Sequence, residues 1–175
     1  MDEGPPGGDS PLTRTGLPPG KYDVALMQMP GYAVASTTLN GTPVLPGATI
    51  DLESSESLLT FVLTTQLGSV TGMVRDSDGQ AVADATVVVA AELFADTSGA
   101  RFALPPGAGE MVVADGSGRF VVSGLAAGRY KVIALKGGDR RGLIDTGSIR
   151  ERMRLAEGVV VSAGQSTNLE LVAGK

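Results

Sequence analysis

Short valine-rich runs, separated by Gly, Asp, Asn and Ser, are the feature that most limits how this chain can fold. Runs of about four to eight residues with turn residues between them are typical of β-strands. β-Branched side chains suit the pleated surface of a sheet, and Gly readily adopts the positive φ that tight turns require. The pattern predicts an all-β sandwich. The predicted strands are residues 22–29, 58–64, 69–75, 85–91, 111–114, 119–123, 130–135, 158–162 and 167–172.

The spacing of apolar residues refines this prediction. Apolar residues alternate with others in 70–74 and 130–134, so each of these strands is expected to have one apolar face. Only residues 148–157 have helical spacing, with Met153 near the middle of the apolar face. The surrounding segment, 136–154, is locally basic; we interpret it as a solvated excursion, with a patch for an acidic partner as the alternative.

A nine-residue motif occurs twice, at residues 16–24 and 124–132, and both copies contain Gly-Leu-x-x-Gly-(Lys/Arg)-Tyr. The copies start 108 residues apart, which is about the length of one immunoglobulin-like sandwich. Too few residues precede the first copy for a complete module. We therefore expect a truncated module whose unpaired strand edges, in residues 16–65, are available for self-association. The expected parts are a disordered Gly/Pro-rich tail at 1–14, the C-terminal half of a β-sandwich module at 15–65 and a complete module at 66–173.

Two Asp-x-x-Gly segments, at residues 76–79 and 115–118, are predicted to form hairpin-type turns. In such turns the Asp side chain accepts hydrogen bonds from nearby backbone N–H groups, and the Gly takes positive φ. Phe120 and Val122 are then expected to face the core. The later Gly-Leu-x-x-Gly-x-Tyr segment predicts a tyrosine corner, with Leu125 turned inward and the Tyr130 hydroxyl bonded to the backbone.

Over residues 67–173 the chain resembles the carboxypeptidase regulatory-like domain family, a transthyretin-like, seven-stranded β-sandwich of the immunoglobulin-like and carbohydrate-binding-like class. Residues 16–63 are similar to the second half of such a module in multi-domain bacterial surface or secreted proteins. The resemblance implies no catalytic residues, and it implies an extracellular, periplasmic or cell-envelope location. The structural motif that carries it consists of Asp115, Gly118, Phe120, Leu125, Gly128 and Tyr130.

The composition excludes several classes of function. The chain has no His, Cys or Trp, so it lacks a Ser-His-Asp or Cys-His nucleophile, a thiolate redox centre and the usual zinc ligands. A formal net charge of −5 disfavours nucleic-acid binding, which needs a basic face. No apolar run is long enough for a transmembrane segment, and residues 1–11 lack the features of a signal peptide. We expect no cofactor.

Asp76 and Asp78 are the candidate metal ligands, because Asp-x-Asp-Gly supplies the oxygen atoms that Ca²⁺ prefers. The position of the bidentate Glu in an EF-hand loop is occupied here by Val87. We therefore favour a plain β-turn and no metal. An internal Lys–Asn isopeptide bond at Asn168 is disfavoured, because the first strand of the complete module contains no Lys.

Two segments, 93–109 and 136–154, are longer than a hairpin needs and are the expected binding loops. The candidate binding residues in them are Phe94, Arg101, Phe102, Arg140 and Arg141. A polysaccharide is one partner considered, although sugar sites usually use exposed aromatic rings and this chain has few.

Together these features predict a non-catalytic β-sandwich module of a larger bacterial envelope or secreted protein, acting as a spacer, a stabiliser or a protein–protein interaction domain. Its expected partners are other domains of the parent protein or another protein. A carbohydrate- or peptide-binding module is the alternative. A small carboxylate-dependent hydrolase is a more distant one.

Overall fold

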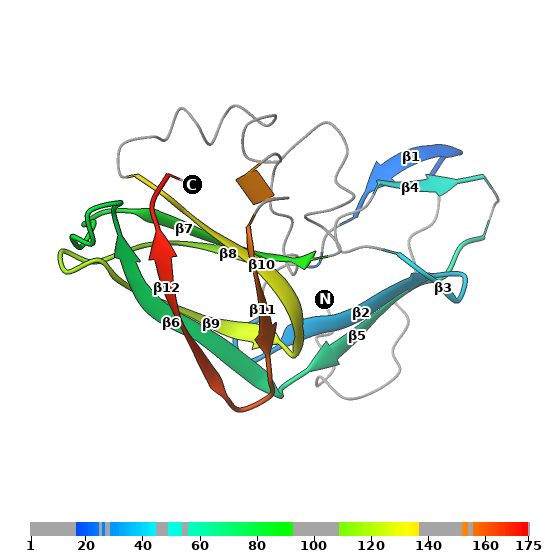
Figure 1. The fold of residues 1–175 in the computed structure, drawn as a ribbon. Helices are drawn as coiled ribbons and strands as arrows, with labels where there is room; N and C mark the ends of the chain where they lie inside the picture. The colour runs from blue at the N-terminus through cyan, green and yellow to red at the C-terminus, as the bar shows by residue number, and fades with distance from the viewer. Residues whose placement is uncertain are drawn as a thin grey trace.

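The computed structural model of this protein describes residues 17–24, 26, 29–44, 49–53, 56–92, 109–136, 152–153 and 156–174. Within these residues β-strands build four sheets, and the all-β class predicted from the sequence is confirmed. The strands form two groups, between residues 20 and 64 and between residues 67 and 172, which we call the N-terminal unit and the C-terminal unit (Figure 1). The tail predicted for residues 1–14 lies outside the described residues.

The C-terminal unit consists of two sheets packed against each other. The antiparallel sheet has the order β11-β10-β7-β8, with β7 Thr86–Ala91, β8 Gly109–Val113, β10 Gly128–Leu135 and β11 Glu157–Val161. The other sheet has the order β12-β6-β9, with β6 Leu67–Arg75, β9 Arg119–Ala126 and β12 Ser166–Val172. In it, β6 pairs antiparallel with β9 and parallel with β12. The seven-strand count stays a prediction, because segments inside this unit lie outside the described residues.

The main core lies between these two sheets. Val70 and Val74 of β6 are fully buried, and Phe120 and Val122 of β9 are almost so. They pack against apolar residues of β7, β10 and β11, including Val87. Full burial of one such side chain stabilises the fold by about 1.5–3 kcal/mol, so this layer supplies much of the stability of the unit.

A second apolar cluster covers the opposite face of the β7–β10 pair. Ile133 and Leu135 of β10 are buried there beside Val88 of β7, and the side chain of Met153 is completely buried against them. The expectation of a single apolar face in residues 130–134 was therefore wrong, because the strand is covered on both sides. Most of the helix predicted for residues 148–157 lies outside the described residues; Met153 lies in a described two-residue helical segment.

The N-terminal unit contains two small sheets. β1 Gly20–Asp23 pairs with β4 Thr49–Leu52, and β2 Ala33–Leu39 lies between β3 Thr42–Pro43 and β5 Leu59–Thr64. The strand predicted for residues 22–29 is shorter than expected, because β1 ends with its four-residue partner β4. β2, β3 and β4 were not predicted. The turn between β2 and β3 carries a hairpin signal, since Asn40 and Gly41 have φ of 50° and 80°.

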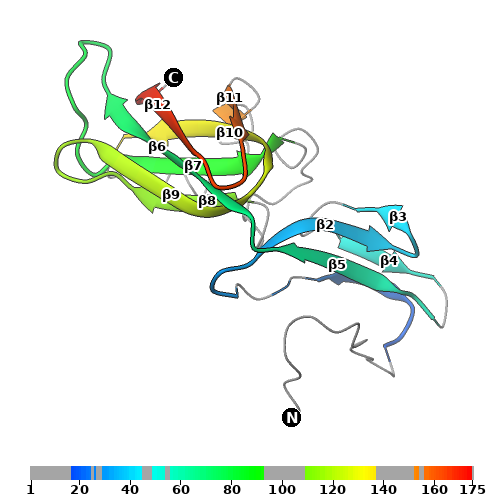
Figure 2. The same ribbon diagram turned by 90° about the horizontal axis from the view of Figure 1, so that it is seen from below.

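The two units are joined by a very short connection. Only Thr65 and Gln66 separate β5 from β6, and Figure 2 shows one strand running into the next. The Gln66 N–H donates to Thr64 Oγ1 at 3.0 Å, and the Leu67 N–H donates to the Thr65 carbonyl at 3.0 Å. β2 also contacts β9 across the junction. The connection is thus held by two local hydrogen bonds, one to a side-chain hydroxyl and one to a backbone carbonyl.

Candidate functional site

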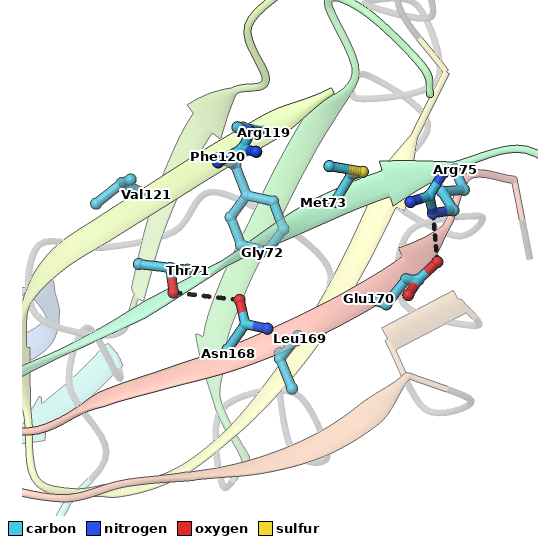
Figure 3. Close-up of a pocket in the computed structure, with 10 residues that line it drawn as sticks. All are labelled: Thr71, Gly72, Met73, Arg75, Arg119, Phe120, Val121, Asn168, Leu169 and Glu170. Carbon is cyan, nitrogen blue, oxygen red and sulfur yellow. Dashed lines mark hydrogen bonds and ion pairs between the residues drawn. The ribbon is translucent and has the colours of Figure 1, made fainter. Parts of the chain in front are cut away.

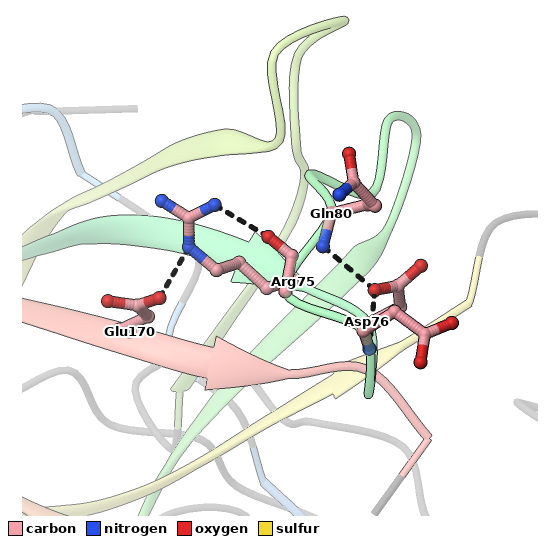
Figure 4. A network of polar contacts seen from close by, with 6 residues as sticks. Arg75, Asp76, Gln80 and Glu170 are labelled. Carbon is pink, nitrogen blue, oxygen red and sulfur yellow. Dashed lines mark hydrogen bonds and ion pairs between the residues drawn. The ribbon is translucent and has the colours of Figure 1, made fainter.

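The two Asp-x-x-Gly turns have the same hydrogen-bond geometry. Asp76 Oδ1 accepts bonds from the N–H groups of Asp78 and Gln80, both at 2.9 Å (Figure 4). Asp115 Oδ1 accepts bonds from the N–H groups of Ser117 and Arg119 at 2.8 and 2.9 Å. The glycines that end the turns, Gly79 and Gly118, have φ of 80° and 77°. In each turn, one carboxylate oxygen thus accepts hydrogen bonds from two backbone N–H groups of the same turn.

The carboxylate of Asp115 has an additional partner, the hydroxyl of Ser117, which donates to Asp115 Oδ1 at 2.7 Å. That hydrogen bond, together with the two backbone N–H donors and the nearby charge of Arg119, lowers the pKa of Asp115. All these donors favour the charged form of the carboxylate. Asp115 is therefore held as an anion that caps its turn.

The carboxylates proposed as calcium ligands belong to the first of these turns. Asp76 Oδ1 is already engaged by two N–H donors, one of them from Asp78 itself. Across the described part of the chain, no group of three or more His, Cys, Asp or Glu side chains is placed to hold a metal ion. Asp76 thus stabilises a β-turn, and the expectation that Asp76 and Asp78 hold no metal stays a prediction.

The repeated Gly-Leu-x-x-Gly-x-Tyr motif forms a corner in both units. The Tyr130 hydroxyl donates to the Ala126 carbonyl at 2.9 Å, and the Tyr22 hydroxyl donates to the Pro18 carbonyl at 2.6 Å, each four residues back along the chain. The first bond is buried and the second is exposed. Burial raises the pKa of Tyr130, because its phenolate would be poorly solvated.

The leucines of the two corners differ in their surroundings. Leu125 is 4% exposed and lies in the main core, whereas Leu17 is 45% exposed. Gly128, the second glycine of the complete motif, begins β10 and pairs with Val161 of β11. The same local sequence thus makes the same turn in both units, but only the C-terminal copy is packed into a core.

A shallow depression of about 510 Å³ lies on the outer face of the β12-β6-β9 sheet (Figure 3). Thr71 of β6 is paired in register with Asn168 of β12, and its hydroxyl donates to Asn168 Oδ1 at 3.5 Å. Phe120 lines the depression, but its side chain is turned into the core and is 3% exposed. The depression is lined by apolar side chains such as the exposed Val121 as well as polar ones, and it offers no exposed aromatic ring for a sugar to stack on.

Arg75 closes one end of this surface. Its guanidinium forms an ion pair with Glu170 of β12 and donates from Nη1 to the Gly79 carbonyl at 2.8 Å (Figure 4). Arg75 thus ties the turn after β6 to the neighbouring strand. A second ion pair joins Arg129 Nε to Glu92 Oε2 at 2.7 Å, next to the end of β7. Neither pair could be predicted from the sequence, because the partners are far apart in the chain.

The five candidate binding residues belong to the segments 93–109 and 136–154. Phe94, Arg101, Phe102, Arg140 and Arg141 all lie outside the described residues, so the loop-binding hypothesis stays a prediction. In the described part of the chain, no helix is long and apolar enough to cross a membrane.

Comparison with known proteins identifies a family for the C-terminal unit. Residues 69–173 match the model of the carboxypeptidase regulatory-like domain family. Among curated proteins, none matches the chain. Similar solved structures include the TIE protein of Bacillus anthracis, at 15% identity and a TM-score of 0.38, with 71% of this chain and 20% of that one covered.

Two pilin structures are similar as well. The major pilin subunit of Bacillus cereus has 13% identity and a TM-score of 0.36, with 72% of this chain and 34% of that one covered. A streptococcal ancillary pilin has 21% identity and a TM-score of 0.38, with 90% of this chain and 43% of that one covered. The matches span less than half the length of these three proteins.

Proposed function

This chain belongs to the carboxypeptidase regulatory-like domain family, and from that premise we propose that it is a non-catalytic spacer module of a larger envelope or secreted protein. It holds neighbouring domains of the parent protein at a fixed distance and orientation. The residues 15–65 act as part of a preceding module of the same kind, and residues 66–173 as the complete one. The partners of the chain are those neighbouring domains or another protein.

The observation that carries this proposal is the connection between the units. A flexible linker needs several residues that make no fixed contacts, whereas β5 and β6 are separated by only two. Both residues take part in local hydrogen bonds, through the Gln66 N–H and the Thr65 carbonyl. Such a connection supports a fixed orientation of one unit relative to the other.

The motif residues give further support. Asp76, Asp115 and Tyr130 each use their polar atoms to hold a turn or a corner of the backbone. Their chemistry is thereby accounted for by folding alone, as a structural module requires.

Small-angle X-ray scattering tests the proposal directly. The wild-type chain is expected to give the profile of one elongated particle, because the units cannot reorient. Inserting Gly-Ser-Gly-Ser between Thr65 and Gln66 is expected to broaden the distance distribution. The same insertion after Gly174 serves as the matched control, because it adds equal mass beyond the end of β12, at the end of the β6–β12 pair opposite the junction. A wild-type profile as broad as that of the junction insertion would overturn the proposal.

The carbohydrate-binding alternative receives no support from the depression on the β12-β6-β9 sheet, whose aromatic residue is buried. A glycan array tests this alternative. If the wild-type chain binds a glycan and the double substitution of Phe94 and Phe102 abolishes the binding, a carbohydrate-binding function replaces the spacer function.

A further inference from the structure

The path of the chain through the C-terminal unit begins on β6 and ends on β12, and these two strands are parallel neighbours (Figures 1 and 2). Seven pairs are in register, from Ser69–Ser166 at one end to Arg75–Val172 at the other. The chain therefore enters at one end of this ladder and leaves at the opposite end. At about 3.3 Å per residue, the two points are separated by roughly the full length of a strand.

This arrangement decides how tension acts on the unit. When neighbouring domains pull on the start of β6 and on the end of β12, the two strands are drawn past each other along their length. All pairs of the ladder then resist together, because none can separate before the others. In a hairpin pulled from its open end, by contrast, the pairs separate one after another. Forced unfolding is governed by the rate of crossing the unfolding barrier, so the direction of loading matters more than the total stability.

We propose that the C-terminal unit bears tension along its length, with the parallel β6–β12 ladder as the force-bearing element. This inference rests on the spacer function proposed above.

Backbone bonds secure both ends of the ladder. Where the chain enters, the Ser69 N–H donates to the Gln165 carbonyl at 3.0 Å and the Gly164 N–H donates to the Leu67 carbonyl at 2.9 Å. Where it leaves, the Ala173 N–H donates to the Arg75 carbonyl at 2.8 Å. The ladder thus extends beyond the seven registered pairs at the points where force would first be applied.

Side chains bridge the same two strands on the outer face. Arg75 of β6 forms the ion pair with Glu170 of β12, and the Thr71 hydroxyl lies 3.4 Å from the Ser166 hydroxyl. Both bridges are diagonal, because each joins residues two positions apart in the register. The hydrogen bond from the Thr71 hydroxyl to Asn168 Oδ1 joins residues directly in register, so it lies across the direction of sliding and breaks when one strand shifts along the other.

On the inner face, β12 is anchored by apolar contacts. Leu171 is 4% exposed in the main core, and Leu169 packs against that core. A Cβ atom at Gly72 would collide with the carbonyl oxygen of Leu169 and with the ring of Phe120, so the glycine permits close approach of β6 to its neighbours. Thr71 of β6 and Asn168 of β12 are in register and joined by a hydrogen bond, and β6 contains no Lys, so the contacts between these two strands are non-covalent.

Single-molecule force spectroscopy of the full chain, with two attachment geometries, tests the inference. The chain has no Cys, so pairs of introduced cysteines define unique attachment points. Attachment through Gln66→Cys and Lys175→Cys loads the ladder in shear. Attachment through Ser77→Cys and Lys175→Cys pulls β6 and β12 from the same end and unzips the ladder. The unfolding force is expected to be several-fold higher in the first geometry at the same loading rate. Equal forces in the two geometries would overturn the inference.

Two variants test whether the contacts of the β6–β12 ladder determine the unfolding force. Leu169→Ala loosens β12 and is expected to lower the unfolding force in shear. Tyr130→Phe removes a hydrogen bond of β10, outside the ladder, and is expected to leave that force unchanged while lowering the equilibrium stability. A fall in force that tracks the equilibrium stability of both variants would show that the ladder does not bear the load.

The two proposals can fail separately. A flexible junction in the scattering experiment together with a high shear force would reject the spacer and leave the load-bearing ladder in place. A rigid junction with equal forces in both geometries would do the reverse.

Discussion

At the scale of single residues, the two turn glycines have almost the same φ but different surroundings. A Cβ atom at Gly118 would lie 2.7 Å from the Val74 carbonyl oxygen, whereas a Cβ atom at Gly79 would meet nothing within 4 Å. Both positions require the left-handed region, where a side chain costs about 1–2 kcal/mol. Only Gly118 adds a steric conflict with a neighbouring strand.

Gly118→Ala is therefore expected to lower the free energy of unfolding more than Gly79→Ala, by at least about 1 kcal/mol, the lower end of overpacking costs. Urea unfolding of both variants, followed by far-UV circular dichroism, measures the difference. Equal losses would mean that backbone conformation alone decides the cost at both turns.

The two tyrosine corners form a second matched pair. Tyr130→Phe removes a buried hydrogen bond and leaves the Ala126 carbonyl without that donor, which is expected to cost about 1–2 kcal/mol. Tyr22→Phe removes an exposed bond that water can replace, so its effect should be under about 0.5 kcal/mol. Thermal unfolding of each variant tests this ordering, and a larger loss for Tyr22→Phe would contradict it.

The lowered pKa of Asp115 makes part of the free energy of unfolding depend on pH in the acid range. Because its pKa is lowered in the folded state, the stabilisation is complete above the ordinary Asp pKa of about 3.9 and is lost as the pH falls through the lower folded-state value. Asp115→Asn is expected to be less stable than wild type at neutral pH and to approach it in strong acid. Urea midpoints measured across this range test the prediction; a difference that is independent of pH would refute it.

At the scale of elements, the strands of the C-terminal unit could be predicted and several of the N-terminal unit could not. Strands such as β9 and β11 contain adjacent valines and lie next to turns that contain Gly118 and Gly164, so composition and turn signals agree. β2 reads Ala-Val-Ala-Ser-Thr-Thr-Leu, and β3 is only two residues long. β2 pairs with β5 on one side and with β3 on the other. Pairing with a strand distant in the sequence, such as β5, leaves no pattern in the residues of β2 itself.

The same limit applies to the candidate site. The turns at residues 76–79 and 115–118 were predictable in detail, because Asp and Gly act there on their own backbone. The ion pair of Arg75 with Glu170 was not, because it depends on which strands are neighbours. Burial of Ile133 and Leu135 was missed for a similar reason, since the cover on that face comes from Met153, later in the chain.

Met153 gives a prediction at this scale. It is completely buried against β7 and β10, so Met153→Ala is expected to lower the free energy of unfolding by about 2–5 kcal/mol through loss of contacts and formation of a cavity. Met111→Ala is the control, because Met111 is 43% exposed and its loss should cost under about 0.5 kcal/mol. Chemical unfolding compares the two. Similar small effects would show that the second apolar cluster contributes little.

At the scale of the whole molecule, the N-terminal unit has much less core than the C-terminal unit. Of its described residues, Ile50 is the only buried apolar side chain, while Val62 and Leu58 are 49% and 63% exposed. The apolar core formed by the described residues of this unit is small, and a small core gives little stability on its own. Self-association through the edges of residues 16–65 stays a prediction that this exposure supports.

Size-exclusion chromatography with light scattering tests it. The full chain is expected to increase in mass with concentration, and a chain with residues 1–65 deleted is expected to remain monomeric. If the full chain is a monomer throughout, and its stability is unchanged by the deletion, the exposed apolar residues of this unit do not mediate association.

The parallel course of β6 and β12 has one more consequence. Because the chain leaves the C-terminal unit at the end opposite to its entry, a copy placed after it by gene duplication would extend the protein in the same direction and would not fold back on it. The reach of such a protein from its point of attachment would then be set by the number of copies alone. A motif repeated at an interval of about one module, such as the one at residues 16–24 and 124–132, is what we expect such a duplication to leave in a sequence.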